Sequence, residues 1–289
     1  MTSVIGTVST ADGTILRTRT WASTDPESEP LALALLVHGL GEHSGRWEHV
    51  GEQMAAEGFA VHGFDLRGHG ASAGRRIHVA AFDEYYADLA ERLVAARAAA
   101  DGRPVIVYGH SLGGLIALGY VLRVAAAAPG SPAAGRPQPD LLVLSAPSLD
   151  STIPAWKIQL ARVLGRIMPT LAIPNPLAGE LLSRDATVGE RYHADPLVLG
   201  FATAGFGVAA LAEQSWVKAA LGALTVPTLV IHGEEDALVP AAASAPLADV
   251  PVVTRRTYPG VRHELHNEPE GPSIVSDVIV WIQRGLAAC

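Results

Sequence analysis

Apolar residues follow two rhythms along the chain, and each rhythm predicts one kind of element. Near the start, apolar and polar residues alternate over residues 4–8 and 14–21 with a turn at Asp12-Gly13, which predicts a β-hairpin. Further on, short continuous apolar runs predict strands that are buried on both faces of a parallel sheet. These runs lie at residues 31–37, 59–64, 104–108, 141–144 and 228–231, and a last strand, with polar residues among its apolar ones, is expected at 252–258.

Helical stretches separate most of these runs. Residues 82–100 are rich in Ala, Leu, Glu and Arg, which favour helices. Further helices are expected at 47–57, before Arg123 and at 274–286. Strands that alternate with helices predict an α/β fold, in which a mostly parallel central sheet is flanked by helices on both faces.

The alternation stops between residues 148 and 224, where no strand-like run occurs. We therefore expect a core made of residues 1–147 and 225–289, with residues 148–224 inserted after the sixth strand as a helical cap. Ligands bind such sheets at the carboxyl ends of the strands, so the cap would cover the site as a lid.

One helix of this cap has an apolar face. At about 100° per residue its apolar side chains share one arc, opposite Gln159, Arg162 and Arg166. The arc comprises Ile153, Trp156, Leu160, Val163, Leu164 and Ile167. We expect this face to pack on the core. The alternatives are that it contacts an acyl chain or makes transient contact with a membrane surface.

Composition narrows the class of protein. The 289 residues are 49% hydrophobic and 17% charged, enough for one large α/β domain with an insertion. The formal net charge of −8 argues against a nucleic-acid-binding protein, which needs a basic face for phosphates. The single cysteine, Cys289, allows no internal disulfide.

Neither a signal peptide nor a membrane span is predicted. Residues 1–21 lack an apolar h-region and carry Asp12, Arg17 and Arg19. The longest weakly polar run, residues 197–212, is shorter than the ~18–20 residues that a spanning helix needs. We therefore expect a cytoplasmic protein that is at most peripheral to a membrane.

The fifth predicted strand runs into a motif of the form Gly-x-Ser-x-Gly, at Gly109, Ser111 and Gly113, and a helix pattern follows it. A serine at such a strand–turn–helix bend projects its hydroxyl outward from a strained backbone. The free N–H groups of the helix N-terminus can then stabilise an oxyanion. Ser111 is the predicted nucleophile, although the motif alone also occurs in ordinary turns.

A serine needs a base, and the base needs an orienting acid. Asp236 follows one predicted strand and His263 follows the last one, so both belong at the same edge of the sheet as Ser111. Asp140 and Asp150 are weaker candidates for the acid. The order Ser, Asp, His is the one that α/β-hydrolases use.

Two further motifs fail on spacing. The segment from His263 to His266 is one residue short of the zinc motif His-Glu-x-x-His, and no third ligand is evident. The glycines of residues 39–45 are spaced one residue too widely for the dinucleotide fingerprint. We expect neither a metal nor a cofactor.

These residues resemble the α/β-hydrolase superfamily, and within it the monoacylglycerol lipase and lysophospholipase branch. The motif His-Gly-x-Gly-Glu-His, which begins at His38, is the most specific part of the resemblance. The similar blocks are residues 37–47, 65–72, 109–114 and 258–264, with 191–198 as the exit from the cap.

The resemblance implies a serine esterase that hydrolyses a small-molecule acyl ester through an acyl-enzyme. The expected substrate is a lipid, with a monoacylglycerol as the first choice. It implies an oxyanion hole made by the backbone N–H groups of Leu40 and Leu112. It also places four side chains near a glycerol-like head group: Glu42, Arg46, Tyr192 and His266. The alternative for Glu42 and Arg46 is a loop ion pair.

Other functions remain open on the sequence. The same triad can act on lysophospholipids, other esters or thioesters. A small-molecule receptor on this fold is the non-enzymatic alternative, which an intact Ser, Asp and His argue against. Dehalogenase and epoxide-hydrolase chemistry would place an aspartate where Ser111 stands.

Overall fold

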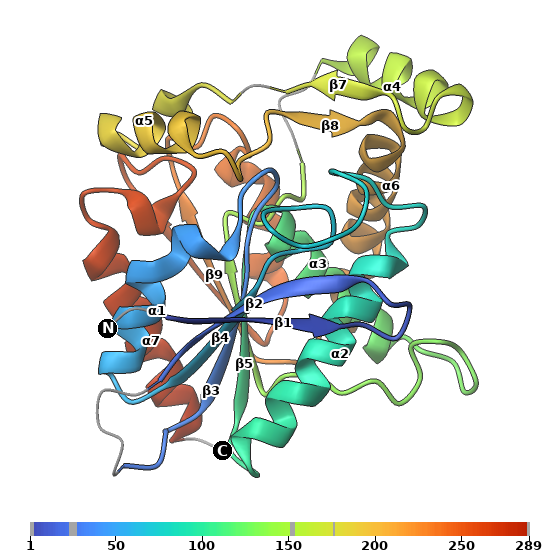
Figure 1. Cartoon of the computed structure of the whole chain (residues 1–289). Helices are drawn as coiled ribbons and strands as arrows, with labels where there is room; N and C mark the ends of the chain where they lie inside the picture. Colours follow the sequence, from blue (N-terminus) through green and yellow to red (C-terminus); the bar gives the residue numbers. More distant parts are fainter. Residues whose placement is uncertain (1–2, 23–27, 151–153, 176, 288–289) are drawn as a thin grey trace.

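The central sheet has eight strands in the order β1-β2-β4-β3-β5-β6-β9-β10 (Figure 1). The computed structural model describes residues 3–22, 28–150, 154–175 and 177–287. Strands β1 and β2 pair antiparallel, β2 pairs antiparallel with β4, and all other pairs are parallel. The strands are β1 Val4–Ser9, β2 Ile15–Trp21, β3 Leu33–Val37, β4 Ala60–Phe64, β5 Val105–His110, β6 Leu141–Ser145, β9 Thr228–Gly233 and β10 Val253–Tyr258. The predicted fold class is confirmed.

Helices cover both faces of this sheet, because alternate residues of each buried strand point to opposite sides. Leu35 and Val107 pack with α2 (Asp83–Ala100) and α3 (Leu112–Ala125). Leu36 and Tyr108 pack with α1 (Glu48–Ala56) and α7 (Gly271–Leu286) on the other face. Strand β5 lies between β3 and β6, so the residue that follows it stands at the middle of the sheet edge.

The chain between β6 and β9 gathers at one end of the sheet (Figure 1). It contains α4 Ala155–Ile167, β7 Ala172–Pro174, α5 Ala186–Ala194, β8 Phe201–Thr203 and α6 Ala204–Ala220. Strands β7 and β8 form an antiparallel pair, so the expectation of no strand in this region is wrong. Each has only three residues, too few for a period of two to show.

Short 3-10 helices connect these elements. They are η1 Ser44–Trp47, η2 Gly179–Leu181, η3 Leu221–Ala223, η4 Ala241–Asp249 and η5 Leu265–Asn267. In the described part of the chain, no helix is both long and apolar enough to cross a bilayer.

Helix α6 is fixed to the core by a buried carboxylate. Glu213 accepts hydrogen bonds from the Tyr86 hydroxyl (2.7 Å) and from Nη2 of Arg123 (2.6 Å). The guanidinium of Arg123 also lies 4.0 Å from the centre of the Trp216 ring. Helix α6 is thus tied to both α2 and α3.

Helix α4 is placed differently from our main expectation. Its apolar arc faces solvent, because Trp156 is 65% exposed, Val163 53% and Ile167 73%. Leu160 is also exposed, and Trp156, Leu160 and Leu164 reach the rim or wall of the cavity described below. The expectation that this arc packs on the core is therefore wrong, and Ile153 lies outside the described residues. Periodicity identifies an apolar face but not what covers it.

Candidate active site

Ser111 occupies a strained bend between β5 and α3. Its backbone has φ 51° and ψ −115°, a region that costs a non-glycine residue about 1–3 kcal/mol. The bend brings main-chain segments together: a Cβ on Gly113 would overlap the carbonyl oxygen of Val37, and one on Gly109 would overlap that of Gly113. These contacts explain why the motif needs both glycines.

The bend leaves the side chain of Ser111 free. Its backbone N–H donates to Ser145 (2.9 Å), and its carbonyl accepts from Leu115 (3.0 Å) and Ser148 (3.0 Å). Within the described residues, Oγ of Ser111 has no hydrogen-bond partner, and the residue lines a cavity. Its hydroxyl is available to a substrate.

Asp236 and His263 form a buried pair. Nδ1 of His263 lies 2.7 Å from Oδ2 of Asp236, while Oδ1 accepts from the N–H groups of Leu238 and Val239, both at 2.9 Å. The two residues follow β9 and β10, whose register pairs Gly233 with Tyr258. With Nδ1–H donating to the carboxylate, Nε2 is left as an acceptor.

This pairing shifts both pKa values. Burial opposes ionisation of Asp236, but His263, His232 and the Val239 N–H outweigh it and hold the pKa of Asp236 well below its usual range. Burial also disfavours the imidazolium of His263, yet the Asp236 carboxylate raises the pKa of His263 above its ordinary value. The carboxylate of Asp236 therefore favours the protonated form of His263.

The structure brings the three predicted residues to one place. Ser111 and His263 line the same cavity, and the ring centroids of His110 and His263 are 4.9 Å apart. The two weaker acid candidates are engaged elsewhere. Asp140 pairs with Arg97 at 2.6 Å before β6 begins, and exposed Asp150 pairs with Lys218 at 3.5 Å.

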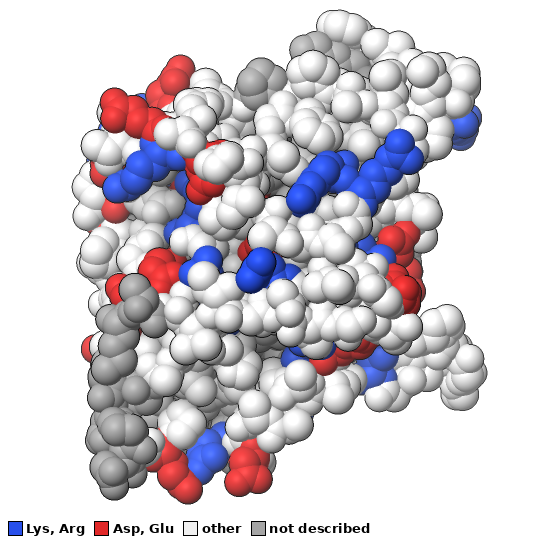
Figure 2. Space-filling view, in the orientation of Figure 1, with Lys and Arg blue, Asp and Glu red and all other residues white. Residues whose placement is uncertain are grey.

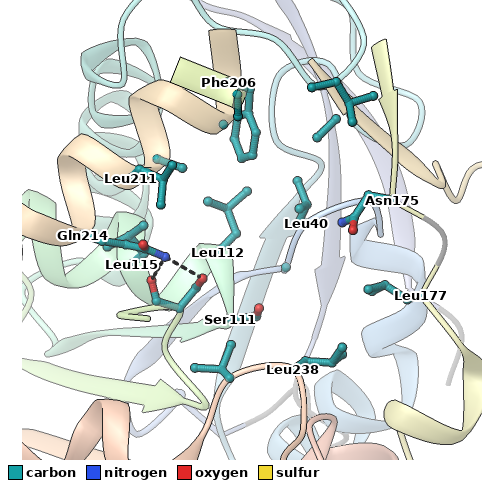
Figure 3. Close-up of a pocket in the computed structure, with 18 of the residues that line it drawn as sticks. Leu40, Ser111, Leu112, Leu115, Asn175, Leu177, Phe206, Leu211, Gln214 and Leu238 are labelled. Carbon is teal, nitrogen blue, oxygen red and sulfur yellow. Dashed lines mark hydrogen bonds between the residues drawn. The ribbon is translucent and has the colours of Figure 1, made fainter. Parts of the chain in front are cut away.

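The residues predicted to supply the oxyanion donors, Leu40 and Leu112, lie close to Ser111 in the cavity (Figure 3). Leu112 is the first residue of α3, so its N–H has no acceptor within the helix. In the part of the chain that the structure describes, neither Leu40 nor Leu112 uses its N–H in a hydrogen bond. Two free donors therefore stand beside the serine.

The cavity above Ser111 has a volume of about 690 Å³. Most of its wall is apolar and comes from α3, α4 and α6 (Figure 3). Typical apolar lining residues are Leu112, Leu115, Leu160, Leu164, Phe206 and Leu211. A polar patch lies beside the serine and contains Glu42, Tyr192, His263 and Glu264.

The four predicted head-group residues divide into two pairs. Glu42 and Tyr192 line the cavity, whereas the wall does not include Arg46 or His266. Arg46 donates to Glu42 (2.9 Å), so the loop ion pair exists, and buried His266 stacks on Trp47 with ring centroids 4.1 Å apart. We therefore no longer assign Arg46 and His266 a direct contact with substrate.

Two features of the cavity were not predicted. Glu264 binds Arg46 with both carboxylate oxygens, at 2.6 and 2.7 Å. Gln214 donates to the carbonyl of Ser148 (3.0 Å) and adds a polar group to the apolar side (Figure 3). The only signal for Glu264 was its position next to His263, because residues 46 and 264 are 218 positions apart.

The chain is similar to known hydrolases in both sequence and structure. The family model described as serine aminopeptidase, S33, matches residues 28–270. A monoacylglycerol lipase of Mycolicibacterium smegmatis is 37% identical over 270 residues, covering 90% of this chain and 91% of that one. Monoglyceride lipase of Homo sapiens is 34% identical over 284 residues, covering 96% and 89%. The crystal structure of Paleococcus ferrophilus monoacylglycerol lipase aligns with a TM-score of 0.79 at 29% identity, covering 93% and 99%.

Replacing Asp236 tests the buried pair. In Asp236→Asn the imidazole loses its orienting carboxylate, so kcat/KM for a nitrophenyl ester should fall about 10⁴-fold. In the unsubstituted protein His263 must be neutral to act as base, and its raised pKa places the acidic limb of kcat/KM above pH ~6.5. Glu235→Gln removes a neighbouring exposed carboxylate and serves as the control. Asp236→Asn activity within tenfold of the unsubstituted protein would contradict the pairing.

Proposed function

Because the chain belongs to the serine aminopeptidase S33 family of hydrolases, we propose that it hydrolyses monoacylglycerols through an acyl-enzyme on Ser111. The relatives that match it over about nine-tenths of both chains are named monoacylglycerol or monoglyceride lipases. Together these similarities identify a serine ester hydrolase.

The first half of the reaction acylates the serine. Oγ of Ser111 attacks the ester carbonyl while Nε2 of His263 takes its proton. The oxyanion accepts hydrogen bonds from the N–H groups of Leu40 and Leu112, each worth about 3 kcal/mol in the transition state. Collapse of the intermediate breaks the ester bond, and His263 returns the proton to the departing glycerol oxygen.

The second half repeats these steps with water. His263 takes a proton from water as it attacks the acyl-enzyme, and Ser111 leaves with that proton when the fatty acid is released. Asp236 keeps Nε2 directed at the reacting atoms and stabilises the imidazolium in both halves. Its 2.7 Å hydrogen bond to Nδ1 supports this role.

The cavity is the observation that supports a lipid ester. Its volume of about 690 Å³ lies within the ~300–1,000 Å³ typical of sites that enclose a drug-sized ligand. The apolar wall suits an acyl chain, and the polar patch beside Ser111 suits the hydroxyls of glycerol. A small closed pocket would instead favour short esters.

The exposed face of α4 supports contact with a lipid surface. Trp156 and Leu160 are both exposed and line the cavity, so they connect the outer surface with the site. The surface over α4 is mostly uncharged (Figure 2). Exposed Arg162 and Arg166 on the opposite side of the helix can meet anionic head groups. We propose that the protein docks peripherally through this face.

Substitution of the nucleophile tests the proposed reaction. Ser111→Ala should lower hydrolysis of 1-lauroylglycerol by about 10⁴- to 10⁶-fold, measured as release of lauric acid. Ser215→Ala, on an exposed turn of α6, should match the unsubstituted protein. Undiminished turnover by Ser111→Ala would eliminate the mechanism. Faster cleavage of lauroyl-coenzyme A than of 1-lauroylglycerol would instead overturn the choice of substrate.

Two positions on the outer face of α4 test membrane docking. The double variant Val163→Ser and Ile167→Ser removes apolar area that does not line the cavity. Flotation with phosphatidylglycerol vesicles should show at least ~10-fold weaker binding, because a buried aliphatic side chain contributes about 1.5–3 kcal/mol. Val94→Ser, at an exposed valine of α2, is the matched control. Equal flotation of all three proteins would refute docking by this face.

A further inference from the structure

The wall of the cavity carries carboxylates and no cationic side chain. Its acidic lining residues are Glu42, Asp150 and Glu264, and among the described residues no lysine or arginine lines it. Asp150 lies at the exposed margin, where it pairs with Lys218. Glu42 and Glu264 are each only 2% exposed and belong to the polar patch beside Ser111.

Glu42 stands close to the nucleophile. Its Oε1 accepts from the N–H of Gly39 at 2.6 Å. A Cβ placed on Gly39 would lie 3.0 Å from this oxygen and 3.3 Å from Cβ of Ser111. The carboxylate is therefore close to the place that an ester bound to Ser111 must occupy.

Among the described residues, Arg46 is the arginine or lysine that contacts these carboxylates, and its donors are engaged with them. Nη1 donates to Glu42 (2.9 Å) and to Glu264 (2.6 Å), and Nη2 donates to Glu264 (2.7 Å). The ring of Tyr192 covers the guanidinium at 4.9 Å. Two carboxylates against one guanidinium give the cluster a net charge of −1.

In the described part of the chain, no neighbouring group cancels this charge. Burial lowers the pKa of His110 to about 4 and that of His266 well below its ordinary value, so both rings are neutral at pH 7. Burial opposes ionisation of Glu264, but Arg46 and Asn267 outweigh it and hold the pKa of Glu264 below its ordinary value. His263 is balanced by Asp236.

We propose that Glu264 and Glu42 make this site select neutral head groups that carry hydroxyls and reject head groups that carry phosphate. The inference rests on the proposed ester hydrolysis and narrows its substrates to monoacyl esters of neutral polyols. A carboxylate oxygen that already accepts one hydrogen bond can accept another from a substrate hydroxyl. A phosphate would face net negative charge in a poorly solvated site, where like charges repel strongly.

Glu264 determines this selection because it withholds Arg46. Without its carboxylate, the Nη2 donor and one of the two Nη1 hydrogen bonds of Arg46 would become available to an anion. Arginine binds phosphate well when its donors are free. A single substitution at Glu264 would thus allow the guanidinium of Arg46 to bind an anion.

The test compares two substrates with the same acyl group. We expect kcat/KM of the unsubstituted protein for 1-lauroylglycerol to exceed that for 1-lauroyl lysophosphatidic acid by about 100-fold or more, since like-charge juxtaposition strongly disfavours a partner. Glu264→Gln keeps the side-chain size and should reduce this ratio at least ~10-fold, because removal of one negative charge brings the net charge of the cluster from −1 to zero. Glu268→Gln neutralises a buried carboxylate of the same loop that pairs with Arg184 outside the cavity, and should keep the ratio.

A binding measurement tests the preference for neutral head groups independently of turnover and of any Glu264 variant. Titration calorimetry on Ser111→Ala should show binding of 1-O-dodecylglycerol, which is a neutral ether. Binding of dodecyl phosphate should be much weaker. Comparable affinity for both ligands, or a substrate ratio below threefold in the unsubstituted protein, would overturn the inference. Failure to hydrolyse either ester, with the neutral ether still preferred, would count against the proposed function alone.

Discussion

The strained backbone at Ser111 is the constraint on which the rest of the structure depends. Its φ of 51° is maintained because β5 and α3 are buried and meet at a bend too tight for side chains at Gly109 and Gly113. Packing of these two elements offsets a local cost of about 1–3 kcal/mol. The bend directs the hydroxyl into the cavity and leaves the first N–H of α3 without a helical acceptor. One local geometry thus supplies both a nucleophile and an oxyanion donor.

The other parts of the site are arranged around this bend by the parallel sheet. Strands β9 and β10 end in register, so Asp236 and His263 follow them at the same edge as Ser111. A second network links the loops that bear Leu40 and His263: the Gly39 N–H binds Glu42, Arg46 bridges Glu42 and Glu264, and Glu264 follows His263. The same ion pairs that hold these loops together also set the charge that the alcohol part of a substrate meets.

Much of this organisation was predictable from the sequence. Continuous apolar runs identified the buried strands, and residues of the right type after three strand ends identified Ser111, Asp236 and His263 as candidates. Three features were not predictable. Strands β7 and β8 are too short to show a period, the apolar arc of α4 does not reveal what covers it, and the Arg46–Glu264 pair joins distant loops. Each of these depends on tertiary packing rather than on local pattern.

The central claim is that the fold makes one serine hydroxyl nucleophilic. Labelling with a fluorophosphonate, followed by peptide mapping by mass spectrometry, tests it most directly. We expect one adduct per chain on the peptide that contains Ser111, formed in the folded protein and absent when the protein is denatured before labelling. A folded protein that gains no adduct, or gains it at another residue, would contradict the account.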